Sequence, residues 1–317
     1  VLNYFNGDGR GGGFPTARGA RNAEALTRQT AKIVAALDAL DADIVALMEV
    51  ENDGFGEQSA LAELVRALNR ARGKQQGDYA FVSPGVERIG DSEIMVALIY
   101  RSSRLQPHGA AAISLDAPFG RGSRVPLAQR FQAGTFDFVV VANHFKSKGC
   151  GEAKGGDQDQ EDGQGCYNAT RADSARALAD WLATAPLGRD DERVLLLGDL
   201  NAYGNEDPLR LLASRGYVDV VSAHASEPAY SYVYGGSSGR LDHALASPAL
   251  AAHVGGASEW HINADESEGF EYSQPDYDPR ALKSRYRADP FRSSDHDPLL
   301  VGLRLQPVVD AAAAPAN

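Results

Sequence analysis

The sequence predicts an α/β fold, and three observations lead to this class. Several runs are almost wholly apolar, among them "IMVALIYR" at 94–101, as is typical of strands covered on both faces. Segments with an apolar residue every three or four positions alternate with these runs, which predicts amphipathic helices. The chain has 317 residues, 43% of them apolar, enough for a sizeable core. We therefore expect helices on one face of a sheet, with room for a second sheet on the other.

In the first part of the chain, the patterns predict strands, helices and one glycine-rich loop. The helical segments place Leu26, Ile33, Leu37 and Leu40, and later Leu61, Leu64, Val65 and Leu68, near one face. In order we expect a strand at 1–6, the loop at 7–20, a helix at 22–40, a strand at 43–51, a helix at 58–72 and a strand at 94–101.

The second part of the chain continues the alternation. We expect a strand at 136–149, a helix at 169–184 and strands at 194–198, 241–246 and 298–305. Residues 264–293 have little periodicity and predict a long surface loop, which is the kind of loop that tends to be functional. We see no internal repeat, so we expect a single domain over 1–307 and a linker-like tail at 308–317.

The net charge is −12, which argues against broad adhesion to nucleic acid or anionic membranes. A local basic cleft and bound cations remain compatible with that total. No apolar stretch is long enough to cross a bilayer. The sequence begins at Val1, without Met, within a predicted strand, and we expect a processed or trimmed start.

The two cysteines, Cys150 and Cys166, enclose a short polar loop. Two free thiols and a metal pair are both open readings. A disulfide is favoured, because no histidine or further cysteine stands at zinc-finger spacing. Such a bond would place the protein outside the reducing cytosol.

Polar residues recur where predicted strands end. In "GDLNA", Asp199 and Asn201 follow a buried strand and, two positions apart, share one side, while Leu200 faces the core. The other strand-end residues are Asn6, Asp8, Glu49, His144, Asp242, His243, Asp295, His296 and Asp297. Each signal alone is weak, since a lone acid at a strand end is usually a solvated surface residue. Active sites on sheet folds gather from such ends, so the set predicts one site.

The residue types in this set suit the hydrolysis of a phosphodiester. A divalent cation offsets the charge of the phosphate and stabilises the leaving oxyanion. Magnesium prefers hard oxygen ligands, which Asp, Glu and Asn provide. A histidine beside a buried carboxylate can donate or accept a proton near neutral pH.

The order Asn–Glu–His–(GDxN)–Asp–(SDH) resembles the endonuclease/exonuclease/phosphatase superfamily, which includes pancreatic deoxyribonuclease and the abasic-site endonucleases. The segments "RGA", "MEVENDG", "VALIYR", "PLAQRF", "NHFKSKG" and "DGQGCYNATR" are similar to those of secreted bacterial nucleases. The resemblance spans about residues 1 to 305. It implies a four-layered sandwich of two packed, mostly antiparallel sheets flanked by helices.

The resemblance also implies roles for the strand-end residues. Glu49 would be the central metal ligand, with Asn6, Asp8 and Asp295 close to the same ion. Asp199 and Asn201 would meet the scissile phosphate, with Asp199 orienting or deprotonating the attacking water. His296 would pair with Asp242 and would donate to a phosphate oxygen or assist the attacking water. His144 would be a second histidine that faces the phosphate. His243, next to Asp242, points to the opposite face and is expected to be structural.

Departures from the family and nearby basic residues add further expectations. In pancreatic deoxyribonuclease an arginine follows two residues after the metal glutamate, whereas Glu51 and Asn52 follow here, so its DNA contacts do not transfer. Glu93 is the candidate carboxylate partner of His144. The basic residues expected to hold the substrate backbone, despite the negative total, are Arg10, Arg18, Arg124, Arg130, Lys146, Lys148 and Arg171.

The predicted function is that of a secreted, divalent-metal-dependent nuclease acting on DNA, with RNA left open. We expect Mg²⁺ or Mn²⁺ at the active site. Ca²⁺ is an open alternative for the acidic loop 150–166, which otherwise reads as a solvated loop. We expect an extracellular or periplasmic monomer without stable membrane association. The alternatives are a phospholipid or inositol-phosphate phosphodiesterase or phosphatase of the same fold and, less favoured, a non-catalytic calcium-binding module.

Overall fold

The structure, a computed structural model, describes residues 1–8, 13–73, 79–188, 192–225, 229–273, 280 and 285–305. Its helices are α1 (Ala23–Leu40), α2 (Ala60–Arg72), α3 (Asn168–Ala183), α4 (Asp207–Ser214), α5 (Val220–His224) and α6 (Pro248–Ala251). Short 3-10 turns lie at Gly155–Asp157 and Glu268–Phe270. The strands are β1 (Ile44–Glu51), β2 (Tyr79–Phe81), β3 (Ile94–Arg101), β4 (Gln106–Pro107), β5 (Ala112–Ile113), β6 (Leu127–Ala133), β7 (Phe136–His144), β8 (Val194–Asp199), β9 (Val218–Asp219), β10 (Tyr232–Tyr234), β11 (Ser237–Gly239), β12 (Asp242–Ala246), β13 (Val254–Glu259) and β14 (Leu299–Leu303).

The larger sheet has the strand order β4-β6-β7-β8-β12-β9, with β5 beside β6. Its pairs are antiparallel except β7–β8, which is parallel. A second sheet has the order β1-β3-β2, and β13–β14 and β10–β11 form two-stranded ribbons. The predicted mixed α/β class with mostly antiparallel sheets is confirmed.

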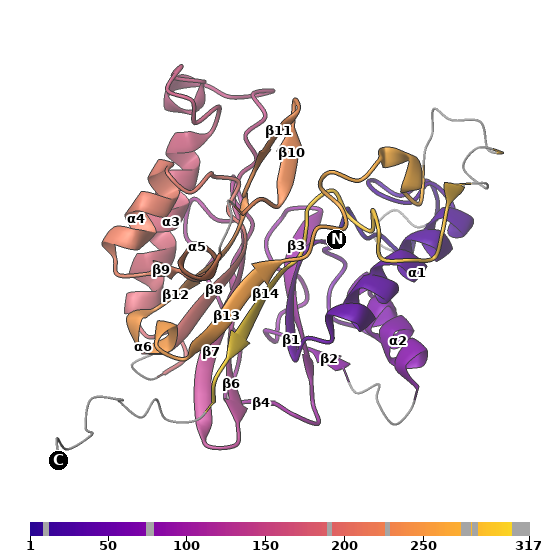
Figure 1. Cartoon of the computed structure of the whole chain (residues 1–317), viewed down its shortest axis with the longest axis horizontal. Helices are drawn as coiled ribbons and strands as arrows, with labels where there is room; N and C mark the ends of the chain where they lie inside the picture. Colours follow the sequence, from indigo (N-terminus) through magenta and orange to yellow (C-terminus); the bar gives the residue numbers. More distant parts are fainter. Residues whose placement is uncertain are drawn as a thin grey trace, which may run out of the picture.

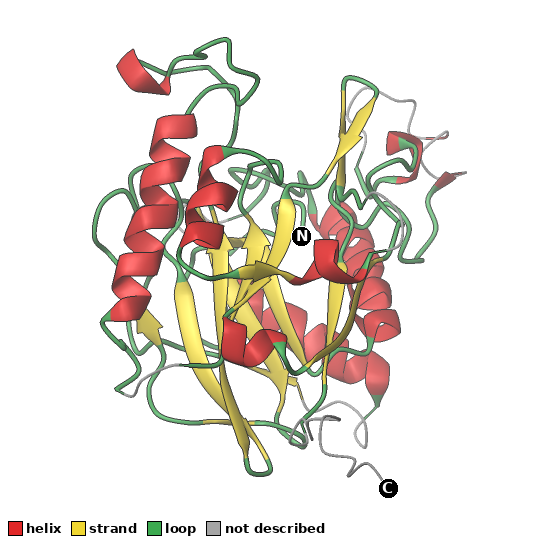
Figure 2. Ribbon diagram, turned by 60° about the vertical axis from the view of Figure 1, so that its left-hand side comes forward, coloured by secondary structure: helices red, strands yellow, loops and turns green. Residues whose placement is uncertain are grey.

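Side chains alternate along the strands and so build layers. In β7, Val140 and Ala142 join the cluster between the sheets, together with Val96 of β3, whereas Val139 and Val141 join the cluster that contains helical residues of α3. Figure 1 shows α3 and α4 on one side of the strands and α1 and α2 on the other, and Figure 2 shows helices on both sides of the strands from another direction. The fold is therefore a sandwich of sheets with helices on the outside. A site can form at the edge where strands of the two sheets end.

Local signals in the sequence explain where the first two helices begin and end. The Asn22 side chain accepts a hydrogen bond from the Ala25 N–H, and α1 ends at Asp41 in the left-handed region. The Ser59 hydroxyl accepts from the Ala62 N–H at the start of α2, and Gly73 follows its last turn. The predicted helices at 22–40, 58–72 and 169–184 are all confirmed, within one or two residues at each end.

Two predicted strands differ from the structure at their ends. Residues 1–6 form no strand and pair through one parallel bridge, Tyr4 with Val50. The strand expected at 136–149 stops at His144, because the polar and glycine residues after it turn away from the sheet. The predicted tail at 308–317 lies outside the described residues.

The remaining expectations about the fold concern the cysteines and the membrane. Cys150 and Cys166 are joined by a disulfide with a Cα–Cα distance of 5.1 Å, which confirms the favoured reading. Within the described ranges, none of the helices has both the length and the apolar character needed to cross a membrane.

Candidate active site

Three adjacent strands of the larger sheet end at the same level and each supplies a site residue. In the strand registers, Asp199 of β8 lies opposite His144 of β7 on one side and Asp242 of β12 on the other. This pairing brings together residues that are more than 40 positions apart in the sequence. All three residues are buried.

The close approach of β7 and β8 depends on a glycine one residue before Asp199. Gly198 has a φ of +141°, and a Cβ there would lie 1.9 Å from the carbonyl oxygen of Asn143. Only glycine fits this conformation and this gap. The glycine of the "GDLN" run therefore sets the distance between the strands that carry His144 and Asp199.

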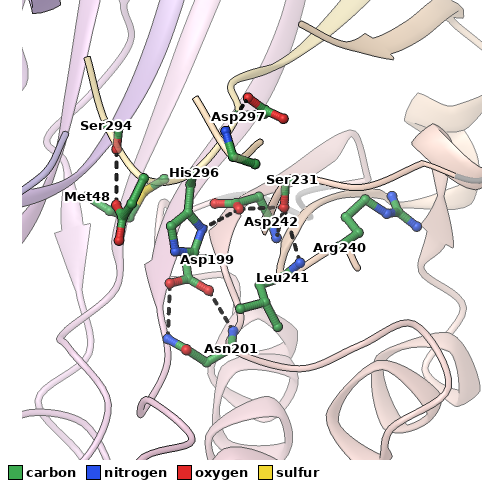
Figure 3. Close-up of polar contacts among 12 residues, drawn as sticks. Met48, Asp199, Asn201, Ser231, Arg240, Leu241, Asp242, Ser294, His296 and Asp297 are labelled. Carbon is green, nitrogen blue, oxygen red and sulfur yellow. Dashed lines mark hydrogen bonds and ion pairs between the residues drawn. The ribbon is translucent and has the colours of Figure 1, made fainter. Parts of the chain in front are cut away.

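His296 and Asp242 form a hydrogen-bonded pair (Figure 3). The Nδ1 atom of His296 lies 2.7 Å from Oδ2 of Asp242. The Ser231 hydroxyl donates to the same carboxylate oxygen at 2.7 Å and accepts from the backbone N–H of Asp242 at 3.1 Å. Burial opposes the charged imidazolium, but the carboxylates of Asp242, Asp199 and Asp295 raise the pKa of His296 to about 10. The hydrogen bond to Asp242 and the surrounding carboxylates therefore favour the protonated form of His296.

The loop that carries His296 is held by two buried residues. The side-chain nitrogen of Asn263 donates to the carbonyl oxygen of His296 at 2.7 Å. One oxygen of Asp297 accepts from the backbone N–H groups of Ile262, Asn263 and Ala264, and its other oxygen lies 2.8 Å from Nδ1 of His261. Asn263 and Asp297 thus act as positioning residues.

Asp199 is bonded to Asn201, which follows it in a tight turn. The Asn201 backbone N–H donates to Oδ1 of Asp199 at 2.8 Å and its side-chain nitrogen to Oδ2 at 3.0 Å. The two side chains meet as predicted, but through a turn in which Asn201 has a φ of +48° rather than through an extended strand. Leu200 faces the core. Burial and the nearby carboxylates of Asp242 and Glu49 raise the pKa of Asp199 to about 7, against the opposing charge of His296.

Glu49 reaches the site from the smaller sheet, where β1 bulges. The register of β1 on β3 shifts between Leu47 and Val50, and Glu49 has a φ of +63°. Burial and the neighbouring carboxylate of Asp295 raise the pKa of Glu49. The α-amino group of Val1 also reaches the site, donating to the Met48 carbonyl at 3.1 Å.

His144 contacts the opposite side of Asp199. Its Nε2 lies 3.6 Å from Oδ2 of Asp199, and its Nδ1 is buried without a hydrogen-bond partner. Burial and the nearby charges of Arg124 and His296 hold the pKa of His144 well below its usual value. His144 is therefore neutral at pH 7. The prediction that Glu93 is the carboxylate partner of His144 is wrong, because Glu93 pairs with Arg18 at 3.0 Å.

Two neighbouring groups of side chains could hold a divalent ion. Atoms of Asp199, Asp242 and His296 all lie within 4.8 Å of one another. Within this group, however, Asp242 is already hydrogen-bonded to His296 at 2.7 Å. Glu49 and Asp295 are neighbouring carboxylates that are not bonded to His296, and their hard oxygens suit Mg²⁺. The donor set therefore fits a magnesium ion at Glu49 and Asp295, on the side of the site nearest β1.

A family model described as the Endonuclease/Exonuclease/phosphatase family matches residues 5–296. The chain belongs to this family. Its members are phosphoester hydrolases that depend on a divalent metal, typically Mg²⁺, so the protein is a hydrolase. None of the curated proteins matches the chain.

Solved structures similar to this chain share the fold. A mannosyl-6-phosphatase from Bacteroides thetaiotaomicron is 16% identical, with 88% of this chain and 91% of that chain covered and a TM-score of 0.57. The human Nocturnin catalytic domain, with a bound sulfate anion, is 15% identical, with coverages of 91% and 92% and a TM-score of 0.51. A truncated Caenorhabditis elegans TDP2 is 11% identical, with coverages of 88% and 90% and a TM-score of 0.50. At these identities the likeness establishes the fold of this Endonuclease/Exonuclease/phosphatase protein and not its substrate.

Three of the predicted basic residues lie near the acids and histidines described above and have partly exposed side chains: Arg18, Arg124 and Lys146. Arg124 acts electrostatically on His144 and is itself influenced by Glu49, Asp199 and Arg18, and its Nε atom is buried without a partner. The Arg18 guanidinium bonds Glu93. Lys146 lies 4.3 Å from the ring centroid of Tyr167. Arg124 is the one of these with an unused buried donor.

The side chains of the other predicted basic residues that the structure describes bond to groups within the protein. Arg171 is fully buried and donates to the carbonyls of Lys146, Gln164 and Cys166. Arg130 is buried in β6 and pairs with Asp137 at 2.8 Å. Lys148 pairs with Glu206. The expectation that Arg130 and Arg171 contact phosphate is wrong, because both side chains are buried. The position of a basic residue in a motif does not tell whether its side chain is buried. Arg10 lies outside the described residues.

Asn6 and Asp8 lie apart from Glu49, and their assignment as ligands of the same ion is corrected. The Asn6 backbone N–H donates to Glu51 at 3.1 Å and its side chain to the Gln58 carbonyl at 2.8 Å. The Asp8 N–H donates to Asn6. Because Tyr4 lies opposite Val50, the residue that meets Glu49 is Asn3, whose N–H donates to the Glu49 carboxylate at 3.2 Å.

Sequence reasoning missed two supporting residues, Ser231 and Asn263. Neither stands in a motif or at the end of a predicted strand, so no local signal identifies them. The ring of Tyr232, 4.5 Å from that of His296, was likewise not anticipated. His243 is buried, with Nε2 2.8 Å from the Ala202 carbonyl, in keeping with the structural role expected for it.

Proposed function

We propose that the protein is a secreted, divalent-metal-dependent nuclease that hydrolyses phosphodiester bonds of DNA. The observation that carries the proposal is the hydrogen-bonded His296–Asp242 pair beside Asp199, near the carboxylates of Glu49 and Asp295. An anionic phosphate placed between these groups would meet a proton donor on one side and a metal site on the other.

Each group has a part in this proposal. Asp199, with a pKa near 7, is suited to orient the attacking water and take its proton. His296 donates to a phosphate oxygen, and Asp242 and Ser231 fix its ring. When bound at Glu49 and Asp295, a divalent ion would offset phosphate charge and stabilise the leaving oxygen. The partly exposed guanidinium of Arg124, which interacts electrostatically with Glu49 and Asp199, offers further donors to the phosphate.

The surroundings of the site favour a polymeric nucleic acid over a small phosphate ester. Lys146, whose side chain is partly exposed, lies 4.3 Å from the ring centroid of Tyr167, and Tyr234, on the β10–β11 hairpin, is 74% exposed. Aromatic rings next to cations are typical of surfaces that stack bases and hold the backbone of a nucleic acid. The disulfide at Cys150–Cys166 supports the proposal of an oxidising, extracytoplasmic location.

The test is cleavage of a covalently closed plasmid with Mg²⁺, with Mn²⁺, with Mg²⁺ plus Ca²⁺, and with EDTA. Nicked, then linear and fragmented DNA is expected with Mg²⁺, and EDTA should abolish cleavage reversibly. Asp199→Ala and His296→Ala should each lower the rate by at least about 100-fold, because each removes a proton-transfer group. His108→Ala changes an exposed histidine away from the site and is the control.

Two outcomes would contradict the proposal. Near-wild-type cleavage by both Asp199→Ala and His296→Ala would remove the site assignment. An untouched plasmid with a folded protein would move the assignment to another phosphoester. Linear DNA, RNA, a phosphate monoester and sphingomyelin would then be tested in the same buffers.

A further inference from the structure

Helix α1 buries two polar side chains in a face that is otherwise apolar. Gln29 is 0% exposed and Lys32 is 1% exposed. Leu26, Ile33 and Leu37 of the same helix belong to the core cluster. Lysine is almost never fully buried, and a buried polar group costs free energy unless it is bonded. The two side chains are three positions apart and so lie next to each other on one face of the helix.

Gln29 holds the segment of chain that contacts Glu49. Its side-chain nitrogen donates to the carbonyl oxygens of Leu2 at 2.7 Å and Asn3 at 3.3 Å. The Asn3 N–H in turn donates to the Glu49 carboxylate at 3.2 Å. Within the described residues, the side-chain oxygen of Gln29 is buried without a hydrogen-bond partner. An apolar side chain would avoid that cost, so the donor group, and not the filling of the core, accounts for a glutamine at this position.

Lys32 holds the segment of chain that leads to Asp295. Its Nζ donates to the Phe291 carbonyl at 2.6 Å and to Oδ1 of Asp289 at 3.0 Å. The acceptor residues stand four and six positions before Asp295. Figure 1 shows this part of the chain alongside α1. A buried ammonium group therefore fixes the approach of the chain to the site.

A tyrosine from the same segment covers Lys32. The Nζ of Lys32 lies 5.6 Å from the ring centroid of Tyr286, and the Tyr286 hydroxyl donates to the Arg28 carbonyl at 3.2 Å. The Arg28 side chain donates in turn to the Tyr272 carbonyl at 2.8 Å. The ring attracts the cation and excludes water, and hydrogen bonds in such surroundings are stronger than in water.

The chain between Phe291 and Asp295 is also held in place. The backbone N–H groups of Ser293 and Ser294 donate to the side-chain oxygen of Asn263 at 2.9 and 3.3 Å. A shift of the Phe291 backbone is therefore passed on to Asp295 and is not absorbed by a loose loop.

We propose that Gln29 and Lys32 are positioning residues for the divalent-metal site. Through them, α1 sets the separation of the two carboxylates, Glu49 and Asp295. The Cα atoms of Gln29 and Lys32 are about 4.5 Å apart along the helix axis, and the helix keeps that spacing rigid. Because Mg²⁺ requires nearly ideal ligand geometry, a small change in the separation of the carboxylates weakens binding. This role depends on the metal site at Glu49 and Asp295 and not on the nucleic-acid substrate.

The experiment measures Mn²⁺ binding in the absence of substrate. Gln29→Met and Lys32→Met remove the donor groups and keep most of the side-chain volume. The concentration of free Mn²⁺ is read from its electron paramagnetic resonance signal. The site is identified as the Mn²⁺ that the wild type binds and Glu49→Gln does not. Val65→Ala changes a buried side chain of α2 and is the control for a general loss of stability.

Each Met variant should raise the dissociation constant of this Mn²⁺ by about tenfold or more, whereas Val65→Ala should change it by less than about twofold. Because Gln29 and Lys32 act on one separation, the double variant should lose less affinity than the two single effects combined. Unchanged constants in both Met variants, or an equal rise in Val65→Ala, would overturn the proposal. If Glu49→Gln removes no Mn²⁺ binding, the metal-site assignment fails and the positioning role fails with it. None of these readouts uses DNA or catalysis, so the result is independent of the proposed nuclease activity.

A milder pair of variants covers the case in which Lys32→Met does not fold. The Asp289 side chain is 40% exposed, and Asp289→Ala removes one acceptor of Lys32 but leaves the Phe291 carbonyl. The dissociation constant should rise by about threefold, as for the loss of one hydrogen bond. Asp289→Asn keeps the acceptor oxygen and should bind Mn²⁺ nearly as the wild type does. An unchanged constant in Asp289→Ala, or equal changes in the two variants, contradicts the role of Lys32.

Discussion

Glu49 and Asn201 both hold backbone conformations that most residues avoid. Their φ values are +63° and +48°, where a side chain other than glycine costs free energy. Both lie at turning points of the chain, Glu49 in the β1 bulge and Asn201 just after β8. The surrounding strands stabilise these conformations, and as a result a carboxylate and an amide point into the site from opposite sheets.

Arg124 is the residue for which the structure gives the sharpest prediction about substrate contact. Arg124→Gln should raise the KM for DNA and lower the slope of log KM against log salt by about 1, because one phosphate contact is lost. The measurement is initial cleavage rate at several salt concentrations. Arg121→Gln, an exposed arginine in the same loop, is the matched control. An unchanged slope for Arg124→Gln would contradict the contact.

At the residue scale, the sequence identifies side chains whose position follows from the end of a strand. Asp199, Asp242 and His296 are of this kind, and the structure brings them together. Asn6 and Asp8 could not be placed, because their position depends on which residue of β1 faces Tyr4. Ser231 and Asn263 act through hydrogen bonds that form only when distant segments meet.

At the scale of elements, the contact between β7 and β8 is unusually close at one point. Gly198→Ala should lower the free energy of unfolding by more than about 3 kcal/mol, because the new methyl group would overlap the Asn143 carbonyl. Gly134→Ala is the matched control: that glycine also has a positive φ, +61°, but its Cβ would meet nothing within 4 Å. Its cost should be about 1–2 kcal/mol. Urea unfolding of both variants measures the difference, and equal costs would contradict this account of Gly198.

Asp41 connects three elements and gives a prediction about pH. It follows α1 and bonds Arg101 of β3 and Arg72 of α2, and these hydrogen bonds lower its pKa to about 2. A lowered carboxyl pKa stabilises the fold above the unfolded value of 3.8, and this contribution is lost as the pH falls toward 2. Asp41 is more than half exposed, so the effect should stay below about 1 kcal/mol.

The variant Asp41→Asn tests this linkage. Its urea midpoint should lie below that of the wild type at pH 5 to 7, and the difference should narrow as the pH is lowered toward 2. Asp116→Asn changes an exposed aspartate elsewhere and should show no such trend. A difference that is constant from pH 7 to pH 3 would show that the ion pairs are not its cause.

Most elements could be predicted because their patterns are local. The periodicity of α1 and α2 and the apolar runs of β3, β7 and β8 all lie within single windows of sequence. The strand expected at 1–6 failed for a different reason: its side chains suit a strand, but only Tyr4 finds a partner on β1. Pairing between strands is a non-local property, and the same limit applies to the short strands β4, β5 and β9.

At the scale of the whole molecule, the disulfide closes the loop that precedes α3. Cys150→Ala/Cys166→Ala should lower the free energy of unfolding by about 3 kcal/mol, since the bond closes a loop of 16 residues. Reduction of the wild type should give the same loss, and reduction of the double variant none. Urea unfolding with and without reductant is the measurement. An equal stability of the reduced and oxidised wild type would contradict the prediction.

The α/β class, the sandwich and the family could be predicted from the whole chain. They depend on the order of strands and motifs over some 300 residues, which is more specific than any one motif. The charge distribution could not be predicted in the same way. Of the arginines that stand beside motifs, Arg124 lies near the acids of the site, whereas Arg171 is buried in the interior. The fold, and not the motif, decides which of these positions an arginine takes.

The pairing of His296 with Asp242 also has a consequence for the order of synthesis. Glu49 leaves the ribosome early, and Asp199 and Asp242 follow, but Asp242 has no histidine to orient until residue 296 has been made. A nascent chain therefore carries the acids of the site without His296. The hydrolase would in this way stay inactive while it is being translated, and would become active only when residue 296 and the strand after it are in place.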